Sequence, residues 1–114
     1  MKKTPFYQVG LDSGAKMIEL FGYQLPWEYS VGHQKEHLAT RSDASLCDLD
    51  YVGSFLIEGP DALAFIQTIM TNDYSRKSVG SIQYTAMCDT EGNMMDDGTV
   101  WRLGDQKYMF VKWL

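Results

Sequence analysis

Three strand-like segments in the C-terminal half constrain the fold more than any other feature of this chain. They read "IQYTAMC", "NMMDDGTVWRL" and "KYMFVKWL", residues 82–88, 93–103 and 107–114. Aromatic, β-branched and other apolar residues, which favour strands, are frequent in all three. The short connectors "DTEG" and "GDQ" carry the Gly and Asp residues of tight turns. Consecutive strands joined in this way predict an antiparallel meander.

A further strand and a helix are predicted just before this meander. The strand is "YVGSFLIEG", residues 51–59, and the helix lies in "GPDALAFIQTIMTND", residues 59–73. Pro and Asp at the start of the second segment suit the first turn of a helix. Apolar residues at helical spacing predict one face turned to the core, formed by Leu63, Ile66 and Met70 and flanked by Phe65 and Ile69.

The N-terminal part carries weaker signals. Residues 1–31 are predicted to be irregular with short extended pieces, because Gly22 and Pro26 interrupt the apolar stretch. Residues 31–46 predict a short surface helix in which Leu38 points inward. The order of strand, helix and hairpins predicts an α+β fold, an antiparallel sheet with two short helices, forming a single and partial domain over residues 1–114.

Composition narrows the class of protein. Hydrophobic residues make up 45% of the chain, enough for a compact core. The net charge of −5 and the lack of a basic stripe argue against a nucleic-acid partner. No apolar run has the length of a membrane span, so we expect no membrane partner and a cytoplasmic location. Cys47 and Cys88 are predicted to be buried free thiols, with a single disulfide as the alternative.

The last predicted strand runs to the C-terminus without a polar residue to end it. An unpaired apolar edge invites association with another strand. We therefore expect either a homo-oligomer formed through this C-terminal edge strand or a chain that is a piece of a longer protein.

Two adjacent carboxylates, Asp96 and Asp97, stand in the middle predicted strand. Neighbouring side chains of a strand point to opposite faces, so the two acids must have different surroundings. Gly98, which follows them, permits a bulge or the close approach of another group. One interpretation is that the acids protect an edge strand, and the other is that one of them is a functional carboxylate in an apolar pocket.

Two other features allow a functional and a structural interpretation. The stretch "HQKEH" gives His33, Glu36 and His37 the spacing of a zinc hydrolase motif, although histidines on a polar helix are often simply solvated. Aromatic residues lie on all three meander strands, where they can form the core or a platform for a flat heterocyclic ligand. These are Tyr84, Trp101, Tyr108, Phe110 and Trp113.

Five blocks of the sequence, in order, resemble the N-terminal part of the glycine cleavage T-protein (aminomethyltransferase) family. The same family includes the folate-binding parts of sarcosine and dimethylglycine dehydrogenases and several tetrahydrofolate-dependent demethylases. The blocks are "KTPFY", "GAKMIELFGYQLPWEYS", "EHLATRSDASLCDLD", "GPDALAFIQTIMTNDYS" and "YTAMCDTEGNMMDDGTVWRL". They cover nearly the whole chain.

The resemblance implies folate-dependent transfer of an aminomethyl or methyl group, with tetrahydrofolate as cofactor and no metal. In T-proteins the aminomethyl group arrives on the lipoyl arm of a partner protein, so the implied partners are folate and a one-carbon donor such as a lipoyl carrier protein. The resemblance assigns the catalytic acid to Asp97 and a folate contact to Tyr84. It places Trp101 and Val111 near the ligand. The alternative is a non-catalytic, self-associating short derivative of the family.

Overall fold

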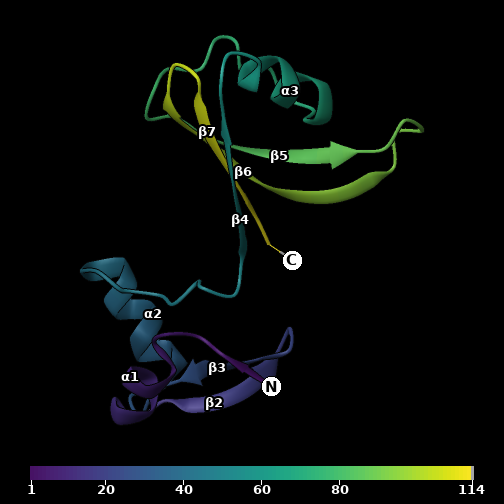
Figure 1. Ribbon diagram of the computed structural model, residues 1–114. Coiled ribbons are helices and arrows are strands. Elements are labelled where there is room, and N and C mark those ends of the chain that lie inside the picture. Colours follow the sequence, from purple (N-terminus) through teal and green to yellow (C-terminus); the bar gives the residue numbers. More distant parts are fainter. Residues whose placement is uncertain (114) are drawn as a thin grey trace. The chain divides into compact units, whose positions relative to one another are not determined.

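The computed structural model describes residues 1–113 and divides the chain into two compact units, Met1–Tyr51 and Val52–Leu114 (Figure 1). Leu114, the final residue of the last predicted strand, lies outside the described residues.

The N-terminal unit is more regular than the sequence predicts. Its strands form a sheet of order β1-β3-β2, in which β2 and β3 are antiparallel and β1 joins β3 in parallel. Its elements are β1 (Lys2–Lys3), α1 (Tyr7–Asp12), β2 (Lys16–Leu20), β3 (Tyr23–Glu28) and α2 (His33–Ser42). The short extended pieces predicted for residues 1–31 are thus present as β1, β2 and β3, but the expectation that this part is irregular is wrong.

The β2–β3 hairpin explains that error. Phe21 and Gly22, the two residues between the strands, have φ of 55° and 77°. Positive φ at both positions is the geometry of a tight two-residue hairpin turn, so Gly22 joins two strands and does not interrupt one. Pro26 is tolerated within β3 because β1 pairs only with Tyr23 and Gln24 and leaves the next residues free on that side.

The predicted surface helix is present as α2, but one assignment within it is wrong. Leu38, expected to point inward, is 63% exposed. Mostly polar residues surround it on the helix, so periodicity gives no stripe that would fix an inward face.

The C-terminal unit confirms the meander. Strands β5, β6 and β7 follow one another as antiparallel neighbours in a sheet of order β4-β7-β6-β5. The elements are β4 (Gly53–Glu58), α3 (Ala62–Ile69), β5 (Ile82–Cys88), β6 (Met94–Gly104) and β7 (Lys107–Lys112). The α+β class is confirmed, with α1 as a helix additional to the two expected.

Strand β7 corrects the prediction of an unpaired C-terminal edge. It lies between β4 and β6 and pairs with both along its length. The edges of this sheet are β4 and β5. The premise for self-association through the C-terminal strand is therefore wrong, because a strand paired on both sides has no free backbone groups to offer a second chain.

Helix α3 packs on one face of the C-terminal sheet (Figure 1). Ile66 and Met70 are buried and Leu63 is partly buried against the same cluster, as the helical spacing predicts. The helix side of the core also includes Ala62, while Phe65 is 51% exposed. On the sheet side the core residues are Val100, Tyr108 and Phe110.

Both cysteines are free thiols. Cys88 is half-buried, but Cys47 is exposed, so the expectation that both are buried is wrong for Cys47. Among residues 1–113, none of the helices combines the length and apolar character needed to cross a membrane.

Candidate functional site

Strand β6 places its two carboxylates on opposite faces of the C-terminal sheet. Val100 belongs to the core under α3, and side chains alternate along a strand. Asp96 therefore shares the α3 face with Val100, while Asp97 shares the other face with Thr99 and Trp101. Strand β6 lies between β5 and β7, but its pairing with β7 begins only at Gly98. Asp96 and Asp97 therefore stand where β6 is paired on one side, and the interpretation that they protect an edge stays open.

The four residues predicted for the site lie together on the face turned away from α3. Thr99 is directly opposite Tyr84 on β5 and directly opposite Val111 on β7. Asp97 and Trp101 lie two residues before and after Thr99 on β6, on the same side of the strand. We call this group, Tyr84, Asp97, Thr99, Trp101 and Val111, the Asp97 face.

A hydrogen bond joins two members of the Asp97 face. The Tyr84 hydroxyl donates to Oδ2 of Asp97 over 2.6 Å, although the Tyr84 side chain is 57% exposed. This bond is the main cause that raises the pKa of Tyr84 above its ordinary value of 10.0; desolvation and the negative charge of Asp97 act in the same direction. Among the described residues, the second carboxylate oxygen of Asp97 accepts no hydrogen bond.

Thr99 is the member that sequence reasoning missed. Its Oγ1 accepts a hydrogen bond of 2.8 Å from the indole nitrogen of Trp101, which fixes the orientation of that ring. Thr99, Trp101 and Val111 are all half-buried. Strand alternation from Asp97 to Trp101 already places Thr99 between them, so the signal was present in the sequence.

Gly98 lets β6 and β7 approach each other closely. A Cβ added at this buried glycine would lie 2.2 Å from the carbonyl oxygen of Val111 and 2.8 Å from the Phe110 ring. The predicted close approach is confirmed. A bulge is also present, but three residues before Gly98, at Met95. Asp96 is opposite Met87 and Met94 is opposite Cys88, so Met95 is the extra residue of β6.

Asp96, on the α3 face, is held by two partners. It forms an ion pair with the ammonium group of Lys112, and its Oδ1 accepts the backbone N–H of Asp97 over 2.9 Å. The side chains of Asp96 and Lys112 are only 12% and 27% exposed. The hydrogen bond from Lys112 is the main cause that lowers the pKa of Asp96, and it outweighs the opposing effect of burial.

An apolar hollow lies on the α3 face of the same unit. It has a volume of about 390 Å³, and Asp96 and Lys112 are its charged members. The other lining residues are Phe55, Leu56, Ile57, Phe65, Ile69, Met70, Met87 and Phe110.

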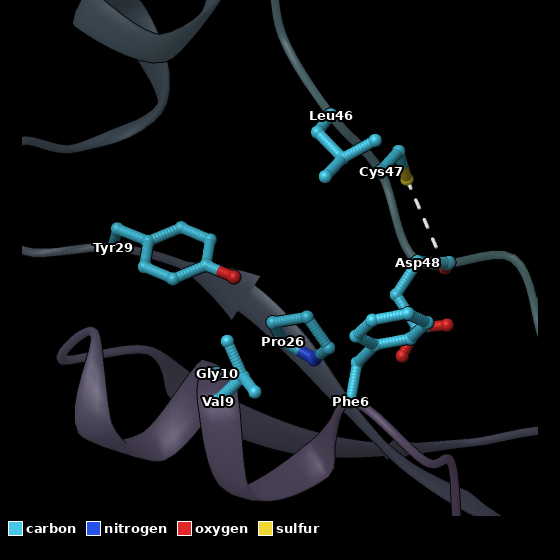
Figure 2. Close-up of a pocket in the computed structure, with 8 residues that line it drawn as sticks. All are labelled: Phe6, Val9, Gly10, Pro26, Tyr29, Leu46, Cys47 and Asp48. Atoms are coloured by element: carbon cyan, nitrogen blue, oxygen red, sulfur yellow. Dashed lines mark hydrogen bonds between the residues drawn. The ribbon is translucent and has the colours of Figure 1, made fainter.

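The N-terminal unit has several hollows, and the one drawn in Figure 2 has a volume of about 140 Å³. Its walls come from the start of α1, from β3 and the residue after it, and from the segment that follows α2. They are formed by Phe6, Val9, Gly10, Pro26, Tyr29, Leu46, Cys47 and Asp48. Neither this hollow nor the one on the α3 face is lined by a member of the Asp97 face.

Two of the three residues of the zinc motif have other partners. His33 Nε2 lies 3.2 Å from Oε2 of Glu28, and Oε1 of Glu36 accepts the backbone N–H of Tyr29 over 2.7 Å. Within residues 1–113, no three His, Cys, Asp or Glu side chains are grouped so that they could hold a metal ion. The geometry gives the zinc hydrolase alternative no support.

Some aromatic residues of the meander form the core, and others lie where they could be a platform for a ligand. Tyr108 and Phe110 belong to the core, whereas Tyr84 and Trp101 lie on the Asp97 face. Trp113 follows β7 and is 42% exposed. The Asp97 face thus combines two aromatic rings, one carboxylate with an uncommitted oxygen and one aliphatic side chain.

Comparison with known proteins gives one consistent result. The family model described as the GCVT N-terminal domain matches residues 6–113. An aminomethyltransferase of Desulforamulus reducens is 42% identical over 111 residues, which are 97% of this chain and 30% of that protein. An aminomethyltransferase of Halothermothrix orenii is 40% identical over 111 residues, 97% of this chain and 31% of that protein.

A solved structure agrees with these relatives. The crystal structure of glycine cleavage system aminomethyltransferase T from Bartonella henselae is similar with a TM-score of 0.90 and 30% sequence identity. The match covers 97% of this chain and 31% of that one. The chain therefore spans roughly 30% of the length of the relatives that it matches.

Proposed function

The chain belongs to the GCVT N-terminal domain family, and we propose that it acts as part of a tetrahydrofolate-dependent aminomethyl- or methyltransferase. In this proposal the Asp97 face is the contribution of these residues to the folate site. The observation that carries it is the convergence of Tyr84, Asp97, Trp101 and Val111 on one face, although they come from three strands.

The chemistry of this face fits a reduced pterin. A flat heterocycle needs an aromatic or aliphatic surface to lie against, and its ring N–H groups need an acceptor. Trp101 and Val111 supply the surface, and the uncommitted oxygen of Asp97 supplies the acceptor. Tetrahydrofolate, when bound, supplies the nitrogen atoms that take up a one-carbon unit.

Each side chain has a distinct role in this proposal. Asp97 is the catalytic carboxylate and acts as a base: it accepts a hydrogen bond from an N–H group of the pterin, can take its proton, and stabilises positive charge that develops nearby. Tyr84, whose hydroxyl is protonated at neutral pH like that of any ordinary tyrosine, donates to Oδ2 of Asp97 and leaves the other oxygen for the ligand. Trp101, fixed by Thr99, is the wall against which the ring lies.

The proposal extends to a donor and a cellular setting. We infer a one-carbon donor that is either a small methylated amine or an aminomethyl group on a lipoyl carrier protein. We also infer that the reaction belongs to one-carbon metabolism in the cytoplasm. The names of the relatives favour the aminomethyl group, since those proteins are called aminomethyltransferases.

Calorimetric titration with tetrahydrofolate tests the proposal. Wild-type chain is expected to bind, and Asp97→Asn to bind about tenfold or more weakly, because one hydrogen bond to a charged group is worth about 1.5–3 kcal/mol. Asp105→Asn, which removes the same charge from a side chain that is 94% exposed, is the matched control and should bind like wild type. Absence of binding at millimolar ligand, or equal binding by Asp97→Asn, would overturn the proposal.

A further inference from the structure

The backbone N–H of Asp97 is bound by a side chain on the α3 face, the face opposite to its own carboxylate. This N–H is donated to Oδ1 of Asp96, at the point where β6 runs past the end of its pairing with β7. The register between these strands begins at Gly98 and Lys112, so Asp97 has no partner residue on β7. The carboxylate of Asp96 thus provides an acceptor for the Asp97 N–H at a position that β7 does not reach.

Lys112 in turn fixes Asp96. The ammonium group of Lys112 pairs with Oδ2 of Asp96, and the two side chains line the apolar hollow on the α3 face. Their low exposure means that water competes weakly for either group. The close approach of β6 and β7 at Gly98 puts Lys112 directly opposite the residue that follows Asp97. A continuous set of contacts therefore runs from Lys112 through Asp96 to the backbone of Asp97.

We propose that Asp96 and Lys112 form a positioning pair that holds Asp97, through its backbone N–H, in the orientation in which it meets Tyr84 and the folate. The pair lies on the far side of the sheet from the ligand and does not contact it. Its consequence for folate binding rests on the proposed function, but its effect on Asp97 does not.

The geometry distinguishes this pair from another ion pair on the same strand. Lys107 pairs with Glu58 over 2.6 Å, but both side chains are about half exposed and neither contacts β6 near the acids. Lys107→Met therefore removes one cation from β7 without touching the path to Asp97. It is the matched control for Lys112→Met.

The first measurement follows the Tyr84 phenol without folate. In the full chain with ¹³C-labelled tyrosine, the Tyr84 signal is assigned by its absence in Tyr84→Phe, and its ¹³Cζ chemical shift is recorded at pH 7, where lysine ammonium groups are charged. Lys112→Met is expected to move this shift toward the value of Asp97→Ala, in which the hydroxyl has lost its acceptor. Lys112→Arg, which keeps a cation, and Lys107→Met should both retain the wild-type shift.

The second measurement is calorimetric titration of the same variants with tetrahydrofolate. Lys112→Met should bind roughly tenfold more weakly, as expected when an acceptor is displaced, and Lys112→Arg should recover most of the loss. A changed Tyr84 ¹³Cζ shift with no folate binding by any variant leaves the positioning pair standing and removes the proposed function. Binding that depends on Asp97 but not on Lys112, with an unchanged Tyr84 shift, removes the pair alone.

Folding of the variants is checked by circular dichroism. If Lys112→Met does not fold, Asp96→Asn takes its place, because the amide has the same shape and still offers Oδ1 to the Asp97 N–H while losing the attraction to Lys112. The same two readings apply to it. Failure of both variants to fold would overturn the proposal, since the pair would then be required for the sheet as a whole.

Discussion

At the scale of single residues, the two neighbouring acids of β6 differ because a strand turns them to opposite sides. Asp96 meets Lys112 in apolar surroundings, and Asp97 meets Tyr84 on the half-exposed face. Alternation alone predicts this division from the sequence. It does not tell which acid faces which side, since that depends on the extra residue Met95 and on where α3 packs.

The Asp96–Lys112 pair predicts a specific response of stability to acid. The pKa of Asp96 is lowered from 3.8 in the folded chain, so the pair stabilises the fold at pH values above 3.8. This contribution is lost as the pH falls through the folded pKa of Asp96. Near pH 7, Lys112→Met is expected to reduce the free energy of unfolding by roughly 1–2 kcal/mol.

Urea denaturation of wild type and Lys112→Met at several pH values checks this expectation. The difference in free energy of unfolding should shrink as the pH is lowered from neutrality to about pH 2.5. Lys107→Met, which breaks the more exposed pair with Glu58, should show a smaller difference throughout. A difference for Lys112→Met that stays constant over this range would contradict the assignment of the pair.

Gly98 gives a prediction about packing at the same scale. Gly98→Ala should lower the free energy of unfolding by about 1–3 kcal/mol, because the new Cβ meets backbone atoms of β7 that cannot rotate away. Gly104→Ala in the same strand is the control, since its Cβ would lie 3.5 Å from Lys107, an ordinary contact. Thermal or urea unfolding that ranks the two variants equally would show that β6 and β7 lie further apart at Gly98 than the added Cβ needs.

All four predicted site residues, Tyr84, Asp97, Trp101 and Val111, came from the family resemblance. Alternation adds only that Asp97 and Trp101, four residues apart in one strand, share a face with Thr99 between them. That Tyr84 and Val111 lie opposite Thr99 depends on strand register. Register is set by turn lengths and by the bulge at Met95, which composition and periodicity do not reveal.

At the scale of secondary-structure elements, α3 and the meander follow directly from local pattern, because helical spacing and turn residues are signals within a few positions of each other. The N-terminal hairpin does not. Its turn uses Phe21 at positive φ, which is uncommon for a bulky residue, and its second strand contains Pro26. The placement of β7 between β4 and β6 depends on a contact between segments some fifty residues apart, from Gly53–Glu58 to Lys107–Lys112.

The buried face of α3 leads to a prediction about the stability of the core. Ile66→Ala should lower the free energy of unfolding by about 2–5 kcal/mol, because Ile66 is fully buried between α3 and the sheet. Phe65→Ala, at the preceding position of the same helix, should cost less, since 51% of Phe65 is exposed in the folded chain. Equal costs in denaturant titration, or a cost below half a kcal/mol for Ile66→Ala, would mean that the buried face of α3 is wrongly assigned.

At the scale of the whole molecule, this chain of 114 residues corresponds to a part of much longer family members. It aligns over 97% of its own length with relatives of which it spans about 30%. Within the C-terminal unit, one face of the sheet is packed by α3, and the other carries the residues assigned to folate. Large apolar side chains remain exposed on it, among them Ile82 at 53%, directly opposite Trp101.

The central claim is that a pterin lies against the Asp97 face, and an NMR titration of the ¹⁵N-labelled chain with tetrahydrofolate tests it most directly. We predict that the amide signals of Tyr84, Asp97, Thr99, Trp101 and Val111 move together and saturate, while those of α3 stay in place. Signals that move instead on α3 or around a hollow of the N-terminal unit would contradict the account, as would a spectrum unchanged at millimolar ligand.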